Sequence, residues 1–76
     1  MKTAKQAFAA GHFKKAAAAF EKAAALDPTS KAAFFNLGVA CKKAGATDKA
    51  VAAFKEAARR GHQKAMNLLA SQNIDW

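Results

Sequence analysis

Two segments of this chain, residues 11–30 and 45–64, carry the same residue pattern at an offset of 34 positions. The less common residues that repeat are a glycine, a lysine and a phenylalanine, at Gly11/Gly45, Lys15/Lys49 and Phe20/Phe54. Alanines repeat in the same register, but alanine is so frequent here that these matches carry little weight. A period of roughly 20–50 residues is typical of proteins in which each unit buries its apolar face against the next. The offset therefore predicts a stacked repeat architecture.

Each unit is predicted to be helical. Apolar residues recur at helical spacing on both sides of Gly45. The two stripes are Phe34, Leu37, Cys41 and Ala50, Phe54, Ala57. Lys42 and Lys43 precede the glycine, an order expected where a helix ends in a left-handed residue with cations near its negative end. The segment from residue 34 to residue 58 is thus predicted to be a helix–turn–helix hairpin.

The composition extends this prediction to the whole chain. Alanine dominates, with one proline and no tyrosine, and such a composition favours helix. We expect one all-α domain with about five helices, at residues 3–10, about 13–26, about 31–43, 48 to about 60 and about 63–71. Candidate N-caps are Thr3, Thr29 or Ser30, and Thr47. Asp27-Pro28, Gly45 and Gly61 are the expected stop signals.

Two residues of the hairpin have predicted packing roles. Gly38 lies inside a helix, where glycine costs roughly 1 kcal/mol relative to alanine, so we expect it to allow close approach of the neighbouring helix. Cys41 follows Leu37 by four positions and is expected to be buried and unreactive, because an apolar environment raises the pKa of a thiol.

Beyond the repeat spacing, individual residues resemble the tetratricopeptide repeat family. Asn36-Leu37-Gly38, with Phe34 where the family has Trp, then Gly45, Ala50, Phe54 and Ala57, resemble one complete repeat. Residues 11–30, closing with Asp27-Pro28, resemble the back half of another, and the tail AARRGHQKAMNLL also resembles Sel1-like repeats. Cys41, Thr47 and His62 depart from the usual pattern. The resemblance implies a partial repeat (1–28), a full repeat (29–62) and a C-terminal capping helix with its tail (63–76).

Several classes of function are not expected. No nucleophile, base and orienting group fall together, so we predict a non-catalytic protein. His12, His62 and one buried cysteine are too few for a zinc site, and no cofactor motif is present, so no metal or cofactor is predicted. The N-terminal apolar run, residues 7–10, is too short for a signal peptide or a membrane span, which favours a cytoplasmic location.

The resemblance implies where a partner binds. In tetratricopeptide arrays the first helix of each repeat lines a concave groove that receives a peptide. Carried over to this sequence, the groove positions are Lys5, Phe8, Ala9, Ala32, Phe35, Asn36, Val39, Lys42 and Lys43. The candidate partner-binding residues are Lys5, Phe35, Asn36, Val39, Lys42 and Lys43.

Helical spacing supports part of this set. Phe35, Val39 and Lys42 lie at i, i+4 and i+7, which would form an apolar patch rimmed by cations and suited to an acidic partner. The alternative for Phe35 is that its ring packs against the first and fifth helices. Lys5, Asn36 and Lys42 or Lys43 form only a fragment of the clamp with which some family members bind a terminal carboxylate.

The charge leaves two other functions open. The formal net charge is +8, from 13 Lys and Arg against 5 Asp and Glu, which favours acidic partners or surfaces. Nucleic acid is the less expected partner, because the basic residues are dispersed and no helix pairs them with exposed stacking aromatics. Self-association into a scaffold or homo-oligomer is the structural alternative, since a short array leaves an apolar end unless a cap covers it.

Overall fold

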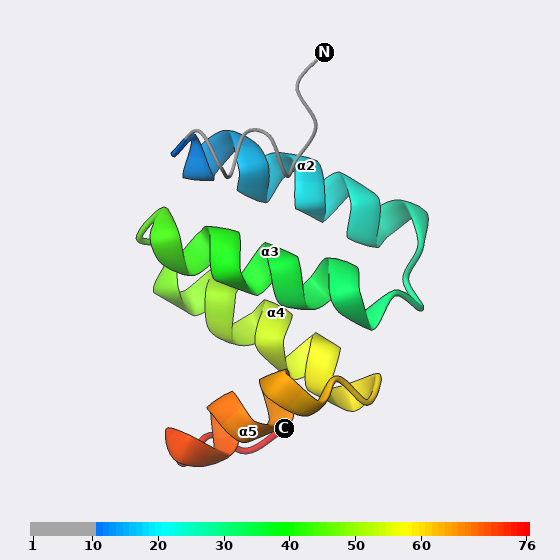
Figure 1. The fold of residues 1–76 in the computed structure, drawn as a ribbon, viewed down its shortest axis with the longest axis vertical. Helices are drawn as coiled ribbons and strands as arrows, with labels where there is room; N and C mark the ends of the chain where they lie inside the picture. The colour runs from blue at the N-terminus through cyan, green and yellow to red at the C-terminus, as the bar shows by residue number, and fades with distance from the viewer. Residues whose placement is uncertain (1–10) are drawn as a thin grey trace.

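The computed structural model describes residues 11–76, which form a stack of helices joined by short turns (Figure 1). The helices of this part of the chain are α2 (Phe13–Leu26), α3 (Lys31–Lys43), α4 (Thr47–Arg59) and α5 (Gln63–Ser71). Consecutive helices run in opposite directions, and α3 lies between α2 and α4. The prediction of an all-α helix–turn–helix fold is confirmed, and the helix expected at residues 3–10 lies outside the described residues.

The turn between α3 and α4 closes as the sequence predicts. Gly45 adopts a positive φ of 85°, the left-handed conformation that glycine accommodates without strain. The Gly45 amide donates to the Lys42 carbonyl at 3.1 Å, and the Ala46 amide donates to the Cys41 carbonyl at 2.8 Å. This pair of bonds satisfies carbonyls that the end of α3 would otherwise leave without partners.

Of the predicted N-caps of α3 and α4, one is confirmed and one is wrong. Ser30 caps α3, because its hydroxyl accepts a hydrogen bond from the Ala33 amide at 3.2 Å. The predicted cap at Thr47 is wrong: Thr47 is the first helical residue of α4, and Ala46 occupies the N-cap with no side-chain hydrogen bond. The cause is the tight turn at Gly45, which starts α4 one residue earlier than expected. Asp48 still places a negative charge in the first turn of α4.

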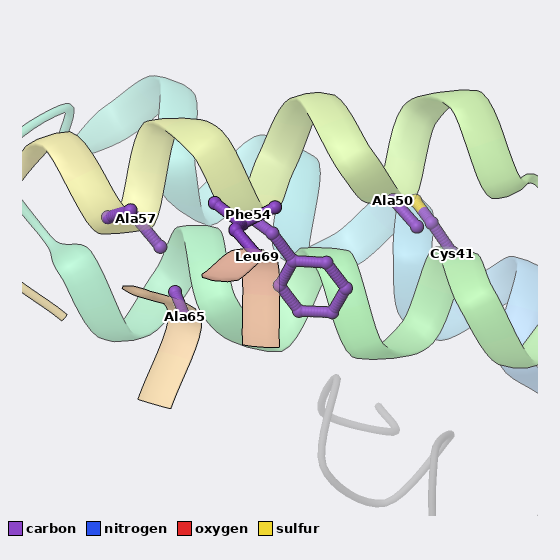
Figure 2. Packing of buried hydrophobic residues seen from close by; sticks show 7 residues of the cluster. Cys41, Ala50, Phe54, Ala57, Ala65 and Leu69 are labelled. Atoms are coloured by element: carbon purple, nitrogen blue, oxygen red, sulfur yellow. The ribbon is translucent and has the colours of Figure 1, made fainter. Parts of the chain in front are cut away.

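The main core joins α3, α4 and α5, as Figure 2 illustrates. Its buried members are Cys41, Ala50, Phe54, Ala57, Ala58, Ala65 and Leu69. A smaller cluster of Ala16, Phe20 and Ala40 joins α2 to α3. The predicted burial of Cys41, Ala50 and Phe54 is confirmed, whereas Phe34 and Leu37 are only half-buried at the edge of the core.

Gly38 allows α4 to lie close against α3. A Cβ atom added to this glycine would lie 2.6 Å from Cε1 of Phe54, closer than real side chains approach. The ring of Phe54 therefore occupies the space that a side chain at position 38 would need. The expected role of Gly38 in close helix packing is confirmed.

Candidate partner-binding surface

One face of α3 carries five of the six predicted binding residues: Phe35, Asn36, Val39, Lys42 and Lys43. They spread over about 120° of the helix, since successive residues are about 100° apart. Lys42 and Lys43 are exposed, whereas Phe35, Asn36 and Val39 are half-buried. The sixth residue, Lys5, lies outside the described residues. This face of α3 thus has half-buried side chains along its length and two exposed cations at its C-terminal end.

The ring of Phe35 has two aromatic neighbours. It stacks on the His62 imidazole, with ring centroids 4.2 Å apart and an interplanar angle of 13°. It also lies 5.5 Å from the ring of Phe54, tilted by 52°. Phe35 therefore packs against α4 and the start of α5, which agrees in part with the alternative stated for it above.

His62 is the N-cap of α5. Its Nδ1 atom accepts a hydrogen bond from the Ala65 amide at 3.3 Å, while its ring lies on Phe35. Burial lowers the pKa of the imidazole, and the positive charges of Lys31 and Lys64 lower it further. The start of α3 and the start of α5 consequently share a region of positive potential around this ring.

The lysines of the α3 face have no acidic partner in the described chain. The ion pairs formed within residues 11–76 belong to Glu56, which binds Arg59 at 2.7 Å and Arg60 at 2.6 Å. The hydrogen bond from Arg60 is the main cause of a lowered pKa for Glu56. Lys42 and Lys43 therefore keep their charge available for an external anion.

Comparison with known proteins identifies the family. A model of the tetratricopeptide repeat matches residues 1–70. The chain belongs to the tetratricopeptide repeat family. No curated protein and no solved structure matches it. Tetratricopeptide repeats generally serve in protein–protein interaction. The resemblance of the tail to Sel1-like repeats and the division of the repeats at residues 28 and 62 stay predictions.

In this tetratricopeptide repeat protein an arginine joins the end of α4 to the start of α3. The Arg60 guanidinium packs on the ring of Phe34, donates to the Pro28 carbonyl and binds Glu56. It thereby ties the end of α4 to the turn between α2 and α3. The sequence analysis missed this role of Arg60, because nothing local in the sequence indicates a contact across 32 residues.

The opposite side of α3 borders a groove of about 470 Å³ that sequence reasoning missed. Its walls carry Ala24 and Ala25 of α2 and Ala52 and Ala53 of α4, and Cys41 lies among its lining residues. The available signal was the run of alanines on both helices, whose small side chains leave the space between them unfilled. Desolvation by burial raises the pKa of the Cys41 thiol, an effect that nearby Glu21 increases. The thiol is therefore protonated at neutral pH.

Proposed function

We propose that this tetratricopeptide repeat protein binds an acidic segment of a partner protein through this face of α3, as part of the concave groove that the family resemblance implies. The observation that carries the proposal is the pair of exposed lysines, Lys42 and Lys43, which no described carboxylate neutralises. Val39 lies one helical turn before Lys43 and supplies apolar surface beside the charges. Asn36 offers an amide that can both donate and accept hydrogen bonds.

The charge of the whole protein supports an acidic partner. A net charge of +8 attracts acidic segments and speeds their encounter with the protein, with an effect that salt screens. The positive potential at the start of α3 and α5 extends the same preference toward Phe35. An acidic segment with apolar residues between its carboxylates therefore matches both the lysines and the apolar positions of this face.

The first test is a titration with a synthetic peptide of alternating glutamate and leucine, labelled with fluorescein. A peptide with glutamine in place of each glutamate is the uncharged control. We expect fluorescence anisotropy to report binding of the acidic peptide only, and NMR shifts to map to Val39, Lys42 and Lys43. Equal binding of the glutamine peptide would rule out recognition through charge.

Charge reversal then tests the site. Lys42→Glu should weaken binding of the acidic peptide about fivefold or more. A tenfold loss of affinity would correspond to about 1.4 kcal/mol of binding free energy. Lys22→Glu, on the exposed surface of α2, makes the same change in net charge away from the α3 face. If the two variants lose affinity equally, overall charge rather than this site explains the binding.

The natural partner needs a separate experiment. Affinity capture from a lysate of the source cells, followed by mass spectrometry, should enrich proteins with acidic segments on the wild-type chain and not on a Phe35→Ala, Lys42→Glu variant.

None of the helices in residues 11–76 is both long and apolar enough to cross a membrane. A cytoplasmic location and a homo-oligomeric state stay predictions.

A further inference from the structure

We propose that His62 and Phe35 form a pH-sensitive switch at the partner-binding surface. In its neutral form the imidazole caps α5 while it lies on the Phe35 ring. In its protonated form it loses the cap and adds a positive charge to the surface beside that ring. The part of the inference that concerns the partner rests on the function proposed above. The part that concerns α5 does not.

The cap requires an unprotonated Nδ1 atom. Nδ1 accepts the hydrogen bond from the Ala65 amide, so the neutral ring carries its proton on Nε2. Protonation places a hydrogen on both nitrogens and removes the acceptor. It also sets a positive charge at the start of α5, where the helix dipole is already positive. Protonation therefore destabilises the first turn of α5 in two ways: the turn loses its capping hydrogen bond, and the imidazolium repels the positive end of the helix dipole.

The charges around the ring oppose protonation in the free protein. Lys31 of α3 and Lys64 of α5 both place positive charge near it. From α4 the ring of Phe54 lies 5.5 Å from that of Phe35, and the Ala57 carbonyl accepts a hydrogen bond from the His62 amide at 3.0 Å.

The arginines closest to His62 in the sequence are Arg59, the last residue of α4, and Arg60, its C-cap, and both form ion pairs with Glu56. No carboxylate of residues 11–76 forms an ion pair with His62. A carboxylate of a bound partner would therefore give the imidazolium an ion-pair partner that residues 11–76 do not supply.

The chain supplies its own control in His12. It too follows a glycine and occupies the N-cap position of a helix, α2, yet its side chain makes no capping hydrogen bond. His12 is exposed, whereas His62 is half-buried between α3 and α5. Replacement of His12 should leave the switch unchanged.

One consequence of protonation favours an acidic partner. The new positive charge of the imidazole joins those of Lys31 and Lys64 beside Phe35. The carboxylates of a peptide stay mostly ionised at pH 5.5, since the ordinary pKa of glutamate is about 4.3. Affinity for an acidic partner should consequently rise as the pH falls from 7.5 to 5.5.

The switch itself is tested without any partner. NMR should follow the titration of His62 together with the hydrogen-exchange protection of the Ala65 amide between pH 8 and pH 5. We expect the Ala65 protection factor to fall as the imidazole titrates in the wild type and in His12→Asn. In His62→Asn it should stay constant, because asparagine caps a helix without titrating. A wild-type protection factor that does not change with pH would overturn the switch.

The coupling to binding is tested with the glutamate–leucine peptide at pH 7.5 and pH 5.5 at constant ionic strength. Wild type and His12→Asn should bind about three- to tenfold more tightly at pH 5.5, since one unit of pKa change corresponds to a tenfold change in affinity. The affinity of His62→Asn should not depend on pH.

The two proposals fail in different ways. Binding that is equally strong at both pH values in the wild type would overturn the coupling and leave the proposed function standing. No binding at either pH would contradict the proposed function, while the Ala65 amide would still decide whether the switch exists.

Discussion

The guanidinium carbon of Arg60 lies 4.1 Å from the centroid of the Phe34 ring. This contact combines a cation–π interaction with hydrogen bonds from the same side chain to the Pro28 carbonyl and to Glu56. It joins the end of α4 to the turn before α3, so one side chain connects segments of the chain that lie 32 residues apart.

Arg60→Ala should therefore lower the free energy of unfolding by about 1–2 kcal/mol, because it removes both the ring contact and the hydrogen bonds. Arg59→Ala is the matched control: its side chain is 53% exposed and its ion pair with Glu56 is worth less than about 1 kcal/mol. Urea denaturation followed by circular dichroism compares the two. Equal losses would show that the contact with Phe34 contributes nothing.

Gly38→Ala should destabilise the protein by about 1–3 kcal/mol, although alanine is the better helix former. The new Cβ atom would overlap the ring of Phe54, so α3 and α4 would have to separate. A double variant with Phe54→Leu should lose less stability than the two single variants added together. Thermal and urea unfolding measure these values, and a more stable Gly38→Ala protein would contradict the observed packing.

Phe54→Ala should cost about 3–5 kcal/mol, because it empties the centre of the main core. A chain of this size has a total stability of about 4–11 kcal/mol, so the variant should be largely unfolded at 37 °C. Leu26→Ala makes a comparable truncation at a side chain that is 87% exposed and should change stability by less than about 0.5 kcal/mol. Circular dichroism at 222 nm distinguishes the two outcomes.

The stability of the wild type should fall as the pH decreases from 8 to 5.5. The unfolded chain binds a proton on His62 with an ordinary pKa of about 6.5, whereas burial lowers the pKa of His62 in the folded protein. In that interval the unfolded state binds more protons, so the free energy of unfolding falls with the pH.

The contribution of His62 is fully present above pH 6.5 and is lost as the pH falls through the lower folded pKa. Urea unfolding at several pH values gives the free energy of unfolding as a function of pH. This free energy should change less steeply with pH in His62→Asn than in His12→Asn. Because the pKa of Glu56 is lowered from an already acidic value, this carboxyl stays ionised throughout the interval. Identical slopes for the two variants would contradict the assignment to His62.

The sequence predicted the helices well because their signals are local. Alanine-rich segments, the Asp27-Pro28 stop and the glycines at helix ends act within a few residues, and the ends of α2 and α5 agree with expectation. Thr47 shows the limit of such signals. Which residue caps α4 depends on the backbone path through the turn at Gly45, and this path shifts the cap to Ala46.

The side-chain contacts of the candidate site could not be predicted in the same way. The stack of Phe35 on His62 joins residues far apart in the sequence, as does the contact of Arg60 with Phe34. Each depends on how far one helix slides along another, which the packing of Phe54 against Gly38 decides. The periodic pattern places Phe35 on a face of α3 but does not say which side chain covers it.

The buried alanines also bear on how this sequence can change over evolution. Eight of the twelve buried apolar residues in residues 11–76 are alanine. Alanine has no side-chain rotamers to lose on burial, so these contacts order the core at little entropic cost. It also fills so little volume that the helices must lie close together, and any larger residue at those positions would push them apart. Substitutions at these eight positions are thereby confined to residues as small as alanine, and diversification is left to the exposed faces of the helices.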